Sequence, residues 1–260
     1  MTAESLFGRV LGSSVRTDVL RSVAAEARET EGVIESVDAS ESAVYTALAD
    51  LEDQGLVRSA EAGWTTTGSG RLVADLLAQQ ADLSALLAEE YWETHDVGTL
   101  PRRFRLRLPD LAEAGVYRAP DTNPHSVVQR VSDRIEAGGD DVDIATPVFQ
   151  PEYEAVMPDD ENARLLVDST MIREAIEHVG GIEEARQFDR TTARVGDVDV
   201  SVGVTDEYLM LSLPRLDGSY DSRTEVFATD ERARAWGEDL FDYYWAQATP
   251  AAEFLSEFFD

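Results

Sequence analysis

The sequence predicts a protein in two parts: an α+β N-terminal part with a small β wing and an α/β C-terminal part with a mixed sheet, joined by a long linker helix. Three observations lead to this fold class. Residues 30–66 have the pattern of a helix, a tight turn, a second helix and a short hairpin. Apolar residues then recur with helical period over residues 67–95, and strand and helix patterns alternate from residue 115 to residue 245. We therefore expect domains at 1–66, 67–99 and 100–260.

The first predicted helix covers about residues 13–28, and Ser13 or Ser14 can cap its start. Its inner stripe consists of four aliphatic residues at helical spacing: Val15, Val19, Leu20 and Val23. Three arginines near this helix can approach a phosphate backbone, with solvated surface as the alternative for each: Arg9, Arg16 and Arg21.

The stretch from Thr30 to Thr66 organises the N-terminal part. A helix beginning near Thr30 is expected to bury three aliphatic residues: Val33, Ile34 and Val37. The next three residues, 38–40, form a turn of the length found in a helix-turn-helix. The second helix opens at Ser40, because a serine hydroxyl can satisfy a free amide of the first turn.

The second helix carries a core stripe at positions i, i+3, i+4 and i+7: Val44, Ala47, Leu48 and Leu51. Gly55 stands where a helix commonly ends. Residues 56–58 and 64–66 can then pair as a hairpin, which forms the wing, around the turn Glu61-Ala62-Gly63.

Two segments, VDASESAVYTALADLEDQGLVRS and TTTGSGRLVADLL, resemble the winged helix-turn-helix of MarR- and TrmB-like archaeal and bacterial regulators. The resemblance implies binding to double-stranded DNA. Serine, threonine and tyrosine hydroxyls can bond base edges or phosphates. We expect DNA contacts from the cap, the outer face of the second helix and the wing: Ser40, Ser42, Tyr45, Thr46, Ala49, Arg58 and Gly63.

One feature favours an alternative to that assignment. The second helix has no basic residue between Ser40 and Gln54, whereas most members of the family it resembles carry more basic residues there. The alternative is a three-helix packing module that never touches DNA. Trp64 is expected to pack against the core of the wing rather than to enter a minor groove.

A long helix is predicted from Thr67, its N-cap, to His95. It carries more apolar surface than a small winged-helix domain can cover. A dimer seam and packing against the second domain both explain this surface, and we expect a homodimer. The apolar residues are Leu72, Val73, Leu76, Leu77, Leu83, Leu86, Leu87 and Tyr91. The apolar end of the chain supports the same expectation: Phe254, Leu255, Phe258 and Phe259.

Residues 96–110 form a junction that holds a cluster of basic residues: Arg102, Arg103, Arg105 and Arg107. Alternation with apolar residues suggests a strand, but Pro101 favours a short helix, which we expect here. The cluster favours contacts with a DNA backbone or an anionic ligand. The alternative is ion pairing with nearby carboxylates.

The C-terminal part alternates strands and helices, as in an α/β domain with a mixed sheet. Strands are expected at 115–118, 142–146, 163–167, 198–204, 208–213 and 223–227. Helices are expected at 124–136, 151–157, 170–179 and, capped by Asp230, through Ala248.

This part resembles the ligand-sensing, phospholipase-D-like domain of TrmB-type and FilR1-type archaeal regulators. The resemblance lies in APDTNPHSVVQRVSDRIEAG, IATPVFQPEYEAVM, VGVTDEYLMLSLPRLDG and EVFATDERARAWGEDLFDYYWAQATP. It implies a one-component transcription regulator, repressor or dual, whose second domain senses a small metabolite or mediates dimerisation. The alternative is a metabolite-sensing adaptor that does not bind DNA.

Ligands in α/β domains tend to bind beyond the carboxyl ends of strands, and anions bind at helix N-termini. Ordinary loop packing is the alternative at each such position. The candidate ligand-binding residues are Asn123, His125, Thr146, Phe149, Tyr153, Asp168 and Ser169.

The net charge of the chain is strongly negative. All 22 basic residues are arginine, against 52 acidic residues, so the net charge is 22 − 52 = −30. A surface that is rich in carboxylates and free of lysine stays hydrated in concentrated salt, where the Debye length falls to about 3 Å at 1 M. We interpret the composition as that of a halophilic archaeal protein.

The residues argue against an enzyme, and we expect no catalytic residue, metal or cofactor. There is no cysteine, the three histidines (His95, His125 and His178) have no ligand spacing, and the His-x-Lys motif of phospholipase D cannot exist without lysine. No apolar run approaches the ~18 residues of a membrane span, and the first residues, MTAESLFGRVLG, lack the features of a signal peptide. We expect a cytoplasmic protein.

Overall fold

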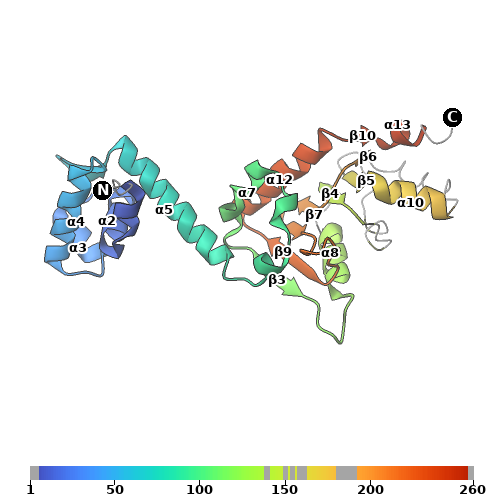
Figure 1. The fold of residues 1–260 in the computed structure, drawn as a ribbon, viewed down its shortest axis with the longest axis horizontal. Coiled ribbons are helices and arrows are strands. Elements are labelled where there is room, and N and C mark those ends of the chain that lie inside the picture. Colours follow the sequence, from blue (N-terminus) through green and yellow to red (C-terminus); the bar gives the residue numbers. More distant parts are fainter. Residues whose placement is uncertain are drawn as a thin grey trace. The chain divides into compact units, whose positions relative to one another are not determined.

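The computed structural model describes residues 6–137, 141–148, 152, 156, 163–179 and 192–256. The chain divides into two compact units, Met1–Ala81 and Asp82–Asp260 (Figure 1). The boundary falls within the predicted linker helix. The three-part division at 1–66, 67–99 and 100–260 stays a prediction.

The N-terminal unit consists of helices followed by a two-stranded hairpin (Figure 1). The predicted helix at 13–28 ends earlier, because Arg28 forms backbone hydrogen bonds with Trp64 in both directions, at 3.2 and 2.7 Å. Ser13 caps this helix by accepting from the backbone N–H of Arg16. The first helix in the unit was not predicted. The elements are α1 (Leu6–Leu11), α2 (Ser14–Ala25), α3 (Thr30–Ser36), α4 (Glu41–Asp53), β1 (Val57–Ala60) and β2 (Gly63–Thr66).

The core of this unit is the predicted one. All four residues of the α4 stripe are buried, and they join the stripe of α2 and Val33 of α3 in one cluster. Ile34 packs against the cluster only in part. Because a Val, Leu or Ile side chain stabilises a fold by about 1.5–3 kcal/mol when fully buried, this shared core holds α4 firmly in place.

Both ends of α4 are fixed by hydrogen bonds. Ser40 caps the start, its Oγ accepting from the backbone N–H of Ala43. At the other end Gly55 has φ +69°, Gly55 donates to the carbonyl of Glu52, and Leu56 donates to the carbonyl of Leu51. This is a Schellman motif, so the predicted cap and stop are both confirmed.

The hairpin pairs Val57 with Thr66 and Ala60 with Gly63. The turn is therefore Glu61-Ala62, and Gly63 belongs to a strand rather than to the predicted three-residue turn. Gly63 has φ +101°, and a Cβ there would lie 2.3 Å from the carbonyl oxygen of Arg28. Only glycine lets the hairpin approach the backbone that follows α2 this closely.

The predicted long helix is shorter than expected. Helix α5 covers Gly68–Leu86, with the hydroxyl of Thr67 accepting from Gly70, and a separate short helix, α6 (Tyr91–Thr94), follows. The prediction of one helix to His95 is wrong, because Tyr91 and Trp92 are anchored in the core of the C-terminal unit. The hydroxyl of Tyr91 accepts from the backbone N–H of Leu213 at 2.7 Å, and its ring stacks on His95 at 3.8 Å.

The junction contains the predicted short helix, α7 (Arg102–Arg105), between two 3₁₀ turns, η1 (Val97–Thr99) and η2 (Leu108–Leu111). Two arginines of this junction make contacts within the C-terminal unit. Arg107 pairs with Asp110 and Asp239, and Arg103 stacks on the ring of Tyr243 at 4.2 Å. The ion-pairing alternative therefore holds for Arg107.

The C-terminal unit is built on a mixed sheet of eight described strands in the order β10-β6-β5-β4-β7-β8-β9-β3 (Figure 1). Strands β4, β5 and β6 are parallel, and the other pairs are antiparallel. The mixed sheet is the predicted one. The strands are β3 (Gly115–Arg118), β4 (Val142–Thr146), β5 (Arg164–Asp168), β6 (Thr192–Gly196), β7 (Ser201–Thr205), β8 (Leu209–Ser212), β9 (Thr224–Ala228) and β10 (Thr249–Pro250).

Two helices pack on opposite faces of this sheet (Figure 1). Helix α12 (Glu231–Trp245), capped by Asp230 as predicted, covers the face formed by Val202, Leu211 and Val226. Helix α8 (Ser126–Ala137) covers the face that carries Ile144 and Met210. The described residues also form helices α10 (Ser169–Val179) and α13 (Ala251–Ser256).

Several predicted boundaries differ from those observed. The strand predicted at 198–204 begins at Ser201, since the N–H of Val198 is bonded to the Asp168 carboxylate instead of a ladder partner. Helix α12 ends at Trp245, three residues before the predicted end. Strands β6 and β10 and helix α13 were not predicted. Most of the helix predicted at 151–157 lies outside the described residues.

Candidate functional site

Four of the predicted DNA-contact residues share one exposed face of α4. Ser42, Tyr45, Thr46 and Ala49 are all exposed, at spacings of three, one and three residues. Tyr45 is half exposed, at 50%. The structure therefore brings these four residues together as one outward surface, which we call the α4 outer face.

The α4 outer face is uncharged, in a protein with a net charge of −30. The carboxylates of α4 lie at its ends and flank: Glu41 at the start, and Asp50, Glu52 and Asp53 near the last turn. Asp50 is paired with Arg16 at 2.9 Å. The hydroxyl groups thus lie on the first two turns of this stripe, and Glu52 and Asp53, three and four residues after Ala49, continue it in the last turn.

The hydroxyl groups on this face differ in whether they already form hydrogen bonds within the protein. Thr46 donates to the backbone carbonyl of Ser42 at 2.8 Å, and Ser42 and Ser40 share a hydrogen bond at 3.3 Å. Among the described residues, the Tyr45 hydroxyl has no hydrogen-bond partner. Tyr45 is therefore the side chain best placed to donate to a group from outside.

The wing contributes one free cation. Arg58 is exposed on β1, and no carboxylate of the described residues lies within ion-pair distance of it. Gly63 does not lie at the wing tip as predicted, because it faces the Arg28 backbone. Trp64 donates from its indole to the Thr30 hydroxyl at 3.1 Å and packs against the core, as predicted.

The predicted ligand-binding residues at strand ends are occupied by internal hydrogen bonds. Thr146 ends β4 and exchanges hydrogen bonds with Val148. Asp168 ends β5 and accepts from the N–H groups of Thr170, Met171 and Val198, so it fixes the start of α10. Ser169 bonds Asp197 at 3.0 Å.

The remaining candidate ligand-binding residues are not brought together with the strand ends that carry Thr146 and Asp168. Asn123 bonds Gln129 at 3.3 Å, and His125 is exposed before α8. Within the described part of the chain, no contact links either residue to Thr146 or Asp168. Phe149 and Tyr153 lie outside the described residues.

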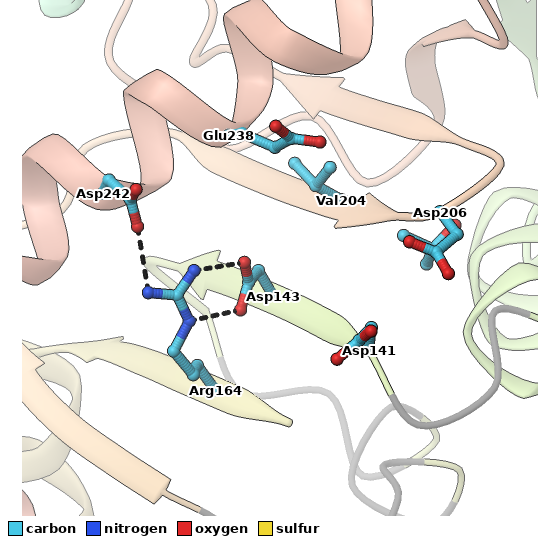
Figure 2. A pocket seen from close by; sticks show the side chains of 8 residues that line it. Asp141, Asp143, Arg164, Val204, Asp206, Glu238 and Asp242 are labelled. Carbon is cyan, nitrogen blue, oxygen red and sulfur yellow. Dashed lines mark hydrogen bonds and ion pairs between the residues drawn. The ribbon is translucent and has the colours of Figure 1, made fainter. Parts of the chain in front are cut away.

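A pocket of about 390 Å³ opens at the other end of β4 and β5 (Figure 2). Arg164 lies in it and binds Asp143 through two hydrogen bonds, of 2.7 and 2.5 Å, and Asp242 of α12 through a third, of 2.9 Å. Burial raises the pKa of Asp143, and Arg164 opposes this shift. The other lining residues are Asp141, Val204, Thr205, Asp206 and Glu238.

Sequence reasoning missed this pocket. A charged residue inside each of two apolar strands, Asp143 in VDIAT and Arg164 in ARLLV, was the available indication, because such residues need a cross-strand partner. Among the described residues, no group of three or more His, Cys, Asp or Glu side chains is placed to hold a metal ion.

Comparison with known proteins finds regulatory proteins. Residues 124–247 match the family model "Methanogenesis regulatory protein FilR1, middle domain", and residues 7–85 match the model "HVO_A0261 N-terminal domain". The chain is 24% identical over 219 residues to the methanogenesis regulatory protein FilR1 of Methanothrix harundinacea. The match covers 77% of this chain and 48% of that protein, so the chain spans about half the length of this relative.

Solved structures resemble the chain more distantly. One is described as TrmBL2, an archaeal chromatin protein with a novel mode of DNA binding; the TM-score is 0.39 at 14% identity, covering 92% of this chain and 94% of that one. Another, a hypothetical protein, has a TM-score of 0.24 at 11% identity over 91% of this chain and 57% of the other. No helix of the described residues is long and apolar enough to cross a membrane.

Proposed function

We propose that the chain is a DNA-binding transcription regulator. Its N-terminal unit acts as a winged helix-turn-helix, and its C-terminal unit senses a small metabolite or mediates dimerisation. The observation that carries the proposal is the α4 outer face, an uncharged hydroxyl-bearing surface on a helix fixed at both ends. The matches to a named regulatory protein support it from an independent direction.

The α4 outer face suits contacts to DNA that do not depend on charge. A helix fits the major groove, where hydroxyl groups bond base edges or phosphates and small side chains contact the thymine methyl group. Tyr45 and Thr46 supply hydroxyls, and Ala49 supplies a methyl group. Ser40 and Ser42 lie at the N-terminal end, where a phosphate is favoured by the free backbone N–H groups. Arg58 supplies a charge-assisted contact from the wing.

The same unit supports a symmetric dimer. Leu72 and Leu76 lie one turn apart on α5, and 68% and 48% of their side chains are exposed. Exposed leucines at this spacing form a seam when a second copy of the helix packs on them. We propose that α5 pairs with its counterpart, which would place two α4 helices at half-sites about 34 Å apart.

The test is a gel shift in molar KCl with a library of genomic fragments from the source organism. A retarded fragment is expected for the wild-type chain. Tyr45→Ala with Thr46→Ala should abolish the shift, whereas Leu216→Ala, which removes an exposed side chain in the C-terminal unit, should leave it unchanged. Unchanged mobility of every fragment with wild type would reject DNA binding.

One observation favours a second function, an adaptor that senses a metabolite and does not bind DNA. Helix α4 has no basic residue and carries four carboxylates. Carboxylates near phosphates oppose binding. An adaptor would shift no DNA fragment at any salt concentration and would still bind its metabolite, so the same gel-shift series separates the two functions.

A further inference from the structure

Helix α4 lacks the side chains that recognise guanine and adenine by paired hydrogen bonds. Arginine or lysine bonds O6 and N7 of guanine, and asparagine or glutamine bonds N6 and N7 of adenine. The helix, ESAVYTALADLED, contains none of these four residue types. The α4 outer face therefore cannot read a base through a bidentate contact from a cation or an amide.

Most hydroxyl groups at the start of α4 are already engaged within the protein. Thr46 donates from Oγ1 to the carbonyl oxygen of Ser42 at 2.8 Å. The Oγ atoms of Ser40 and Ser42 bond each other at 3.3 Å, and Ser40 Oγ also accepts from the backbone N–H of Ala43. The Tyr45 hydroxyl is the one of this group without a partner among the described residues. Hydroxyl groups alone thus give this face little capacity to distinguish bases.

Two methyl groups remain on the same face. With Oγ1 of Thr46 bonded to the helix backbone, the Cγ2 methyl group is the branch of this exposed side chain that is left for an outside partner. The methyl group of Ala49, also exposed, lies three residues further along. Side chains at this spacing have Cβ atoms about 5–6 Å apart. Adjacent base pairs are spaced about 3.4 Å along a duplex, so the two methyl groups span between one and two base-pair steps.

The matching group on DNA is the C5-methyl group of thymine. It is the apolar group that base edges present in the major groove, and alanine and threonine methyl groups contact it. Such a contact needs no positive charge, which suits a helix without basic residues. Glu52 and Asp53, in the last turn, repel phosphates and favour an approach through the first two turns, where Thr46 lies.

We propose that α4 recognises its half-site through thymine methyl groups. Two T·A pairs, one or two base-pair steps apart, place their methyl groups against Thr46 and Ala49, and the free Tyr45 hydroxyl donates to a backbone phosphate. The inference rests on the proposed function and specifies the class of DNA bound, a half-site rich in A·T pairs.

The first experiment removes the methyl groups from the DNA. The bound site is located by footprinting the full chain on the retarded fragment, and a synthetic duplex of that site is made with deoxyuridine in place of thymine. Deoxyuridine keeps the base-pairing edge and lacks only the methyl group. Each lost contact should weaken binding ~4-fold, about 0.8 kcal/mol, so the four contacts of a dimer together give a loss on the order of 100-fold. Deoxyuridine outside the footprint should change nothing.

A second set of duplexes separates the methyl group from the shape of A·T-rich DNA. Replacing the contacted T·A pairs by C·G pairs should abolish the shift. The same C·G duplex made with 5-methylcytosine restores a methyl group in the major groove and should recover part of the affinity. Tighter binding to the unmethylated C·G duplex would instead assign the reading to a carboxylate that accepts from cytosine, such as Glu41.

Two variants of Thr46 locate the contact on the protein. Thr46→Val keeps the Cγ2 methyl group and replaces the hydroxyl, so it should bind as tightly as wild type. Thr46→Ser keeps the hydroxyl and removes the methyl group, so it should bind at least ~4-fold more weakly and lose less affinity on the deoxyuridine duplex. Serine and valine have similar helix propensities, which makes the two variants a matched pair.

Three results would overturn the inference: equal affinity for the thymine and deoxyuridine duplexes, retardation of every fragment alike, or weaker binding by Thr46→Val than by Thr46→Ser. Each of these leaves the proposed function standing, because DNA is still bound. A wild-type chain that retards no fragment rejects the proposed function itself, and the inference with it.

Discussion

At the scale of single residues, Gly63 shows how one backbone position holds the N-terminal unit together. Gly63→Ala places a Cβ 2.3 Å from the Arg28 carbonyl oxygen in a left-handed conformation. Residues forced into such conformations cost about 1–3 kcal/mol, and the clash adds to this. We expect a loss of at least ~2 kcal/mol in chemical denaturation. Gly68→Ala, which meets open space, is the control and should cost nothing. Equal stability of the two variants would contradict the close approach.

Asp221 gives a residue-scale prediction about pH. It is buried, and although burial opposes ionisation, hydrogen bonds from the Arg223 N–H and Thr224 and the charge of Arg215 lower its pKa. His95 also contacts this carboxylate, at 3.2 Å. A lowered pKa adds stability above the unfolded-state value of about 3.9, and this stability is lost as the pH falls through the folded-state value.

The measurement is the free energy of unfolding of wild type and Asp221→Asn between pH 6 and the acid limit of folding. Wild type should be the more stable at pH 6, and the difference should shrink below about pH 4. A difference that stays constant with pH would show that the carboxylate contributes through packing rather than charge.

At the scale of elements, α5 links the two units. It follows the wing directly, and its last residues belong to the C-terminal unit. We propose that an effector bound in that unit would act on α4 through this helix. Such couplings are typically worth about 1–3 kcal/mol. Leu83 is unsuitable for a test of the seam, because it packs against the core of the C-terminal unit.

Leu72→Asp with Leu76→Asp is the sharper variant, because both side chains are exposed and neither is needed for the core. Light scattering should give twice the chain mass of 28.6 kDa for wild type and for Leu216→Ala, and one chain mass for the double variant. A wild-type chain that is monomeric would contradict the proposed pairing of α5 with its counterpart.

The elements differ in how far the sequence could predict them. Helix α4 was predictable to its caps, since Ser40, the stripe and Gly55 act locally. The end of α5 was not, because Tyr91 and Trp92 are buried in the core of the C-terminal unit, where the Tyr91 hydroxyl accepts from the backbone N–H of Leu213, more than 100 residues away. The sequence indicated the charged residues of the pocket, Asp143 and Arg164, but not their pairing, since that depends on the register of β4 and β5.

At the scale of the whole molecule, the net charge of −30 determines how the protein responds to salt. Carboxylates repel one another over a Debye length of about 30 Å at 0.01 M salt and about 3 Å at 1 M. We therefore expect the melting temperature to rise from low to multimolar KCl, as a halophilic protein requires. Thermal unfolding followed by circular dichroism tests this, and a flat or falling midpoint would count against a halophilic origin.

The salt dependence of DNA affinity tests the central claim, that the α4 outer face binds DNA largely without charge. Within the described part of the N-terminal unit, the exposed arginines outside any ion pair are Arg9 and Arg58. A dimer then neutralises about four phosphates, so log K against log[KCl] should have a slope no steeper than about −4. Titration of the retarded fragment at several KCl concentrations should give this shallow slope and should show no binding for Tyr45→Ala with Thr46→Ala. A slope near −10 with that variant binding as wild type would contradict the claim.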